Sequence, residues 1–143
     1  MNSEKLYRRV VTWSDIPEED VRPGVRRRAY ATDGCMLVMN TLQPDMQLNP
    51  HVHEDFDQLA YIVDGHCRYY IDGEPHEMSA GSMLLVPAGS PHYIEPLDGP
   101  CLNLDIFTPP RADLSHLLSY LDATDATEAT GTAEATGATG APA

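Results

Sequence analysis

The chain has few basic residues. Its 143 residues contain 9 Lys and Arg against 22 Asp and Glu, which gives a formal net charge of −13. Proteins that bind nucleic acids neutralise the phosphates with clusters of Lys and Arg, and this composition argues against such a surface. We therefore expect no nucleic-acid partner, and an anionic ligand would need a local cation in its binding site.

Cysteines and long apolar runs are also scarce. The three cysteines, Cys35, Cys67 and Cys101, lie far apart and form no CxxC pair. This spacing favours neither a disulfide framework nor a thiolate zinc site, so we interpret them as small buried hydrophobic residues. The longest apolar runs, such as MLLVPAG, are too short to span a bilayer, and MNSEKLYRRVVTW lacks the features of a secretory signal. We expect a cytoplasmic protein with no membrane partner.

Three segments differ in composition. Residues 122–143 consist almost entirely of Ala, Thr, Gly and acids, and such a segment cannot bury enough surface to offset its ordering entropy. We predict a disordered acidic tail there. Residues 25–121 are long enough to form one domain with its own core, and residues 1–24 precede it as an N-terminal arm.

Short apolar runs separated by turn signals dominate residues 25–108. Asp-Gly pairs, such as those at 64–65 and 98–99, interrupt the runs at short intervals. This spacing predicts an all-β sandwich or barrel. The predicted strands are VRRRAYA, CMLVMNTL, QLAYIV, HCRYYI, SMLLVP, HYIEP and CLNLDIF. One short helix is predicted at 112–121, with an apolar stripe formed by Leu114, Leu117, Leu118 and Leu121.

Histidines at two places indicate a metal site. His51 and His53 are two residues apart, so in an extended segment both imidazoles lie on one face and can grip a divalent ion together. The polar EDFD segment that follows is typical of a turn that would return Gln58 to the same cavity, and His92 opens a later strand. A lone HxH is more often a pair of ordinary polar strand residues, so only the combination favours a metal site.

Together these residues resemble the two motifs of the cupin superfamily. The segment DMQLNPHVHEDFDQLAYIVDG is similar to the first motif at His51, His53, Gln58 and Gly65, with Asp45 in place of its leading glycine. The segment GSMLLVPAGSPHYIEP is similar to the second motif at Gly81, Pro87, Gly89 and His92, with Pro96 where asparagine is usual. The resemblance covers residues 25–108, which is most of the predicted domain.

The cupin resemblance implies a double-stranded β-helix, or jelly-roll barrel, with one divalent metal ion (Fe, Ni, Zn or Mn) at its mouth. The implied ligands are His51, His53, Gln58 and His92. Because Gln58 is neutral, the ion would keep its full double charge and act as a stronger Lewis acid toward an anionic or enolate-like oxygen. An acid of the 54–57 segment would replace Gln58 if the hairpin register shifted by one residue.

A second resemblance concerns LDIFTPPRADL, residues 104–114. It is similar to the ending of small cupins of pectin and alginate breakdown, which open unsaturated uronates to linear keto acids. The match implies that Asp105 is the acid/base, that Phe107 points into the cavity, and that Arg111 offers a planar fork to a substrate carboxylate. Plainer interpretations stay open: Asp105 pairs with an arginine such as Arg68, Phe107 is a cavity wall, and Arg111 is a solvated loop residue.

These inferences favour a metal-dependent isomerase, cyclase or lyase. It would act by proton transfer on a small oxygenated carboxylate, either a uronate-like sugar or a natural-product intermediate. Two alternatives stay open: a non-haem iron dioxygenase, and a non-catalytic module that binds a small ligand with the same metal site. A homodimer is expected, because the flat sheets of cupins often pair.

Overall fold

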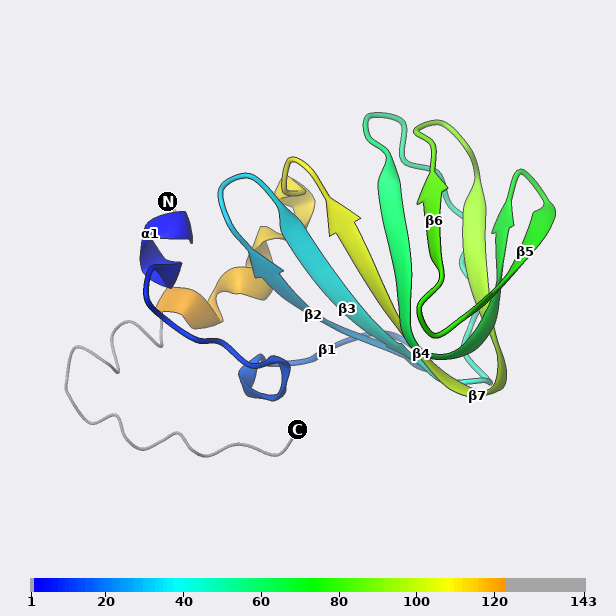
Figure 1. Ribbon diagram of the computed structural model, residues 1–143, viewed down its shortest axis with the longest axis horizontal. Coiled ribbons are helices and arrows are strands. Elements are labelled where there is room, and N and C mark those ends of the chain that lie inside the picture. The colour runs from blue at the N-terminus through cyan, green and yellow to red at the C-terminus, as the bar shows by residue number, and fades with distance from the viewer. Residues whose placement is uncertain (1, 123–143) are drawn as a thin grey trace.

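The computed structural model describes residues 2–122, and these form one bent antiparallel sheet with short helical segments at one end (Figure 1). The predicted tail lies outside the described residues except for Asp122. The strands are β1 (Glu19–Arg22), β2 (Val25–Ala31), β3 (Met36–Leu42), β4 (Gln58–Ile71), β5 (Glu74–Ser79), β6 (Met83–Val86) and β7 (His92–Phe107). The helical segments are α1 (Asn2–Leu6) and the 3-10 turns η1 (Trp13–Asp15) and η2 (Ala112–Leu118).

The strand order is β1-β2-β3-β7-β4-β5, and β6 pairs with β4. The two longest strands, β4 and β7, pair along almost their whole length, from Leu59 opposite Ile106 to Ile71 opposite His92. The long β4–β7 pair therefore runs through the whole fold, and the other strands attach to its two sides. This arrangement confirms the predicted all-β jelly roll.

The predicted breaks at 64–65 and 98–99 are wrong, because QLAYIV and HCRYYI form one strand and HYIEP and CLNLDIF form another. The β4–β7 register shifts between Ile62 and His66, so the Asp-Gly pair at 64–65 marks an irregularity within paired strands. Gly65 has a φ of 97°, and a Cβ at this position would lie 2.5 Å from the carbonyl oxygen of Pro100. A glycine is needed here because the two backbones approach so closely.

The predicted C-terminal helix is short and mostly of the 3-10 type. It comprises η2 and a final helical turn at 120–122. Its predicted apolar stripe is buried: Leu114, Leu117, Leu118 and Leu121. These leucines pack in a hydrophobic cluster with Leu6 of α1, which places the two ends of the described chain together (Figure 1). In the segment predicted as an N-terminal arm, β1 pairs with β2.

Two hydrophobic clusters fill the inside of the bent sheet. One contains Met36, Val38, Phe107 and the C-terminal leucines. The other contains Val25, Leu42, Ile62, Tyr69, Val86 and the two buried cysteines, Cys67 and Cys101. The inward positions between the clusters are polar: on β3, Asn40 separates Val38 from Leu42, and its register partner on β7 is Asn103. The alternation of the strands thus places a polar layer across the interior.

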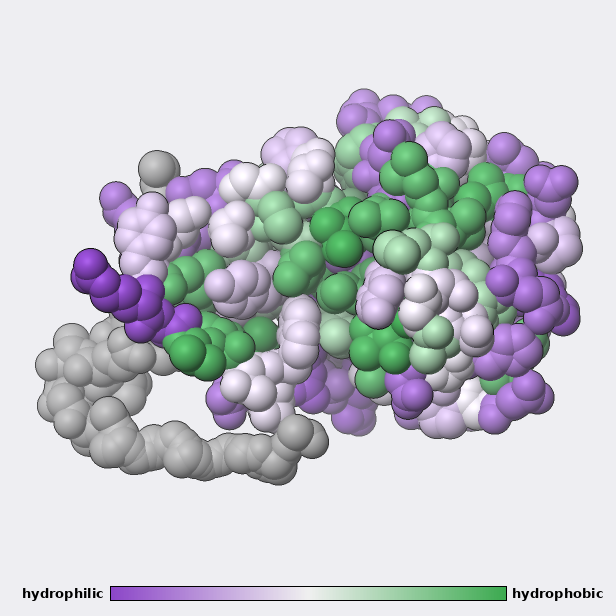
Figure 2. All heavy atoms as spheres, in the orientation of Figure 1, coloured by the Kyte–Doolittle hydropathy of each residue, from purple (hydrophilic) through white to green (hydrophobic). Residues whose placement is uncertain are grey.

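The outer face of the sheet is also rich in apolar residues. The outward positions of β3, β7, β4 and β6 are adjacent in register and carry Leu37, Met39, Leu104, Ile106, Leu59, Tyr61, Met83 and Leu85. Met83 is 67% exposed and Leu85 is 58% exposed. Figure 2 shows hydrophobic side chains gathered across the middle of this face. We call these eight residues the outer apolar face. No helix of the described residues is both long and apolar enough to cross a membrane.

Gly65→Ala should destabilise the fold more than Gly73→Ala. Both glycines have positive φ, at 97° and 81°, so either alanine costs about 1–2 kcal/mol of backbone strain. Only the Cβ at position 65 also meets the Pro100 carbonyl, whereas a Cβ at position 73 meets nothing within 4 Å. Urea denaturation of both variants measures the difference, and equal losses of unfolding free energy would contradict the close approach.

Candidate metal centre

Three histidines lie close together because the chain pairs His51 with His92. The backbone N–H of His51 donates to the carbonyl of His92 at 3.0 Å, and the N–H of His92 donates back at 2.8 Å. His53 follows two residues later on the same side. The ring centroids are 4.3 Å apart for His51 and His92, 4.8 Å for His51 and His53, and 5.1 Å for His53 and His92. One nitrogen from each ring lies within 4.8 Å of the others.

Backbone carbonyls set the tautomer of two of the rings. The Nδ1 of His51 lies 2.6 Å from the carbonyl oxygen of Asn49, and the Nδ1 of His92 lies 2.9 Å from that of Ser90. A carbonyl only accepts hydrogen bonds, so each Nδ1 carries the proton and each Nε2 keeps its lone pair. The Nε2 of His92 is buried and has no partner among the described residues. Both rings thus offer a free ligand atom to the interior.

Gln58 contributes an amide oxygen to the same place. It is the first residue of β4, and its side chain is buried. Its Nε2 donates to the hydroxyl of Tyr69 at 3.2 Å, while its Oε1 is buried without a partner among residues 2–122. An unsatisfied buried polar atom costs about 1–3 kcal/mol. The orphaned Gln58 Oε1 and His92 Nε2 therefore fit a divalent cation as their missing partner.

The electrostatics keep the imidazoles in the neutral form that a metal requires. Burial, with a further contribution from the charge of Arg111, lowers the pKa of His53 to about 4. Burial also lowers the pKa of His51. At neutral pH both rings are therefore uncharged and able to donate a lone pair.

The alternative ligands from the 54–57 segment are not in the histidine cluster, which contains His51, His53 and His92 among the described residues. Asp57 instead accepts a hydrogen bond from the backbone N–H of Ala88 at 2.9 Å. This contact ties the segment to the turn before His92 and leaves Gln58 facing inward.

Asp105 lies in the polar layer beside this cluster. The carboxylate accepts hydrogen bonds from the amides of Asn103 at 2.9 Å and Asn40 at 3.0 Å. Burial raises the pKa of Asp105 to about 6, although hydrogen bonds from Asn103, Gln58 and Asn40 oppose this shift. Arg68 pairs with Glu77 at 2.9 Å, so the alternative in which it neutralises Asp105 is not observed. A carboxyl that titrates near neutrality can both accept and donate a proton.

Arg111 and Phe107 form one wall of the cavity. Phe107 is buried, and the guanidinium carbon of Arg111 lies 4.9 Å from its ring centroid and 5.4 Å from that of Phe56. The Nε and Nη2 of Arg111 bond both carboxylate oxygens of Asp113, at 3.2 and 2.7 Å. Arg111 is therefore held by specific contacts rather than free in a solvated loop.

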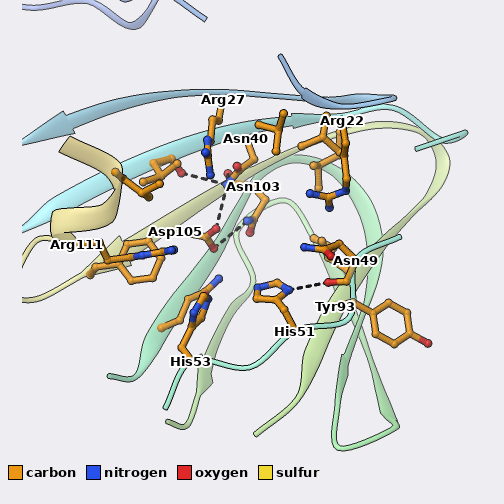
Figure 3. A pocket seen from close by; sticks show the side chains of 18 of the residues that line it. Arg22, Arg27, Asn40, Asn49, His51, His53, Tyr93, Asn103, Asp105 and Arg111 are labelled. Atoms are coloured by element: carbon orange, nitrogen blue, oxygen red, sulfur yellow. Dashed lines mark hydrogen bonds between the residues drawn. The ribbon is translucent and has the colours of Figure 1, made fainter. Parts of the chain in front are cut away.

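Six of these side chains line one cavity of about 200 Å³: His51, His53, Gln58, Asp105, Phe107 and Arg111 (Figure 3). The His92 ring is buried beside that of His51. Sequence reasoning missed several residues that line the cavity: Arg22, Arg27, Asn40, Asn49 and Asn103. Three of them carry a signal in the alternation of the strands. Arg27 and Asn40 occupy inward positions between buried apolar residues, and Asn103 occupies the inward position between Cys101 and Asp105. Arg22 and Asn49 lie outside the predicted strands, and no periodic pattern places them.

Divalent metal should stabilise the wild-type protein and should bind poorly to His92→Ala and His53→Ala. At a metal concentration one hundredfold above its Kd, linkage predicts about 2.7 kcal/mol of added stability. Melting curves with and without Zn(II), together with metal analysis after dialysis, measure both effects. His66→Ala is the matched control, because His66 lies outside the cluster and contacts Glu77 and Asp98. Equal metal content in all four proteins would contradict the site.

Comparisons with known proteins agree with this architecture. Residues 38–107 match the family model of the cupin domain. The pectin degradation protein KdgF of Dickeya dadantii (strain 3937) is 27% identical over 107 residues, which cover 74% of this chain and 97% of KdgF. The solved structure of KdgF from Halomonas sp. has a TM-score of 0.67 and 28% identity, covering 72% of this chain and 94% of that one.

A further solved structure shares the fold. The polyketide cyclase RemF from Streptomyces resistomycificus has a TM-score of 0.62 and 21% identity, covering 73% of this chain and 81% of RemF. The resemblance drawn from the two sequence motifs is thus confirmed by family, sequence and structure. Residues 38–107 of this chain are a cupin domain, and the protein is similar to KdgF.

Proposed function

We propose that this protein is a metal-dependent isomerase, cyclase or lyase that acts by proton transfer on a small oxygenated carboxylate. One observation carries the proposal: the carboxyl of Asp105, whose pKa is raised to about 6, lines the same cavity as His51, His53 and Gln58, whose Oε1 is buried without a partner among the described residues. A proton-transfer group and a set of cation ligands are thus adjacent. Such a pair suits chemistry in which a proton leaves carbon while charge develops on oxygen.

The metal ligands in this proposal are His51, His53, Gln58 and His92. A divalent ion held by these four neutral groups would supply Lewis acidity toward a substrate oxygen. Fe, Ni, Zn and Mn all suit such donors. The carbonyls of Asn49 and Ser90 orient two of the imidazoles, and Tyr69 orients the amide of Gln58.

Asp105 takes the role of general acid and base. The amides of Asn40 and Asn103 hold its two carboxylate oxygens, Oδ2 and Oδ1 respectively, which sets the orientation of the carboxyl group. Phe107 lines this side of the cavity, and the ring of Phe56 packs edge-on against it, with the ring centroids 5.5 Å apart. Arg111, fixed by Asp113, adds a positive charge that favours negative charge on the substrate.

A uronate-like sugar is the substrate class that the relatives support. KdgF is a pectin degradation protein, and pectin is built from uronates, whereas the likeness to RemF extends only to the fold. A natural-product intermediate remains the second substrate class. An iron dioxygenase is less favoured, because the three-histidine cluster lacks the carboxylate of the common facial triad.

Asp105→Asn should lower kcat at least about 100-fold while the protein keeps its metal, because general acid–base groups typically contribute factors of about 10²–10⁴. Turnover of 4,5-unsaturated galacturonate by the Zn(II)-loaded protein, followed by NMR under anaerobic conditions, measures this. Asp98→Asn is the control, since it makes the same chemical change at a side chain that is 81% exposed.

Other outcomes of this assay would assign the alternatives. Oxygen consumption that requires Fe(II) and substrate would indicate a dioxygenase. Binding of the uronate without any conversion would indicate a non-catalytic module. Full turnover by Asp105→Asn would contradict the proposed role of the carboxyl group.

We also propose a homodimer formed through the outer apolar face. Sheets with two apolar faces are normally covered on both sides, and the inner face of this sheet is already covered by its own fold. The outer apolar face spans four strands and contains no charged side chain. A two-fold axis would place this patch against its own copy, as an isologous interface requires.

Replacing both Met83 and Leu85 with Glu should shift the protein from dimer to monomer. Met83 and Leu85 are exposed in the single chain, so the monomer should still fold with Glu at both positions. In a dimer the four glutamates would be buried close together in the interface, which would oppose association. Sedimentation velocity gives the mass of each species. Val10→Glu is the control, because Val10 is 94% exposed and lies outside the outer apolar face. A monomeric wild type, or a dimeric double variant, would contradict this interface.

A further inference from the structure

The cavity is rich in positive charge although the protein is strongly acidic. Arg22, Arg27 and Arg111 all line it, and Asp105 is the single carboxylate among its described lining residues. The whole chain has a formal net charge of −13. The cavity that contains Asp105 therefore also contains three cationic side chains, which is the local positive charge that an anionic ligand would need.

Two of the three arginines already have a carboxylate partner. The Nε of Arg27 lies 2.7 Å from Glu19. Arg111 forms its two-point contact with Asp113. Each carboxylate offsets part of the charge of its arginine, and the Nε–Nη2 edge of Arg111, the edge that a carboxylate prefers, is occupied.

Arg22 differs from both. It is the last residue of β1, and its Nε donates to the carbonyl of Gln47 at 2.8 Å. This bond anchors the side chain and leaves the two terminal nitrogens for another partner. No Asp or Glu of residues 2–122 forms an ion pair with Arg22. Burial, together with the positive charge of Arg27, lowers the pKa of the Arg22 guanidinium, and a bound anion would relieve both effects.

Arg22 and Arg111 lie on opposite sides of the candidate reaction centre. In Figure 3 Arg111 lies at the left and Arg22 at the upper right, with Asp105, Asn103 and His51 between them. Both arginine charges contribute to lowering the pKa of His51. A small molecule anchored at Arg22 would therefore extend toward the histidines and Asp105.

We propose that Arg22 is the specificity-determining residue that binds the carboxylate of the substrate, at the end of the cavity opposite Arg111. Its two Nη groups form the fork that a carboxylate accepts in two-point contact. A cavity of about 200 Å³ suits a ligand smaller than a drug-sized molecule, such as a single sugar acid. The inference rests on the proposed function, because it names the residue that selects carboxylates for that same site.

Equilibrium binding tests this role without requiring turnover. Galacturonate and its uncharged counterpart galactose are titrated calorimetrically into the Zn(II)-loaded protein. Wild type should prefer galacturonate, and Arg22→Gln should weaken galacturonate binding at least tenfold while leaving the response to galactose and the metal content unchanged. Arg22→Lys keeps the positive charge but lacks the two Nη groups, so it should bind galacturonate more tightly than Arg22→Gln and more weakly than wild type.

Arg26→Gln is the matched control, because it removes the same charge from a neighbouring residue that pairs with Asp20 on the surface. It should bind galacturonate as wild type does. Thermal melts of each variant test whether the fold is retained, and Arg22→Lys gives the answer if Arg22→Gln does not fold. Wild-type affinity for galacturonate in the Arg22 variants, or equal binding of galacturonate and galactose to wild type, would overturn the inference.

The Asp105→Asn protein separates this inference from the proposed function. It should still distinguish galacturonate from galactose, because Arg22 is intact. If Asp105→Asn retains turnover while Arg22→Gln loses the preference, the proton-transfer mechanism fails and the carboxylate site stands. If Asp105→Asn loses turnover and Arg22→Gln keeps the preference, the mechanism stands and the carboxylate site fails.

Discussion

The reciprocal backbone pair between His51 and His92 is the contact on which the site depends. These two hydrogen bonds join a segment without regular structure to the start of β7. They bring together ring nitrogens that are 41 positions apart in the chain. The same pairing places His53 on the inner side, and Asp57 secures the adjoining turn through Ala88. Without this backbone contact the interior would still be apolar at both ends, but the ligand atoms would not converge.

The polar layer between the two hydrophobic clusters is the second constraint. Buried amides and carboxyls are costly unless each finds a partner, and here the amide groups of Asn40 and Asn103 donate to the two carboxylate oxygens of Asp105. Three buried side-chain atoms have no partner among the described residues: Asn103 Oδ1, Gln58 Oε1 and His92 Nε2. Asn103 and Gln58 line the cavity, and His92 lies against His51, which also lines it. The fold thus concentrates its unmet hydrogen-bonding capacity at one point, which is what a binding site requires.

Much of this organisation follows from local sequence patterns, and some of it does not. Alternation along β3 and β7 predicts the inner face, and the two histidine-bearing motifs predict the jelly roll. The continuity of β4 was missed, because an Asp-Gly pair is usually a turn, whereas Gly65 here permits a close approach to Pro100. Arg22 was missed because its position is set by the pairing of β1 with β2, and no periodic pattern in the sequence predicts that pairing.

The position of His92 has a consequence for how the protein acquires its site. His51, His53 and Gln58 lie within eight residues of one another, but the strand that supplies His92 pairs with both β4 and β3. Contacts of such long sequence separation form late and slowly, because distant chain segments must first be brought together. A nascent chain that ends before β7 would carry three of the four proposed ligand residues but not the strand that aligns them. Metal binding at the proposed site should therefore follow assembly of the barrel rather than initiate it.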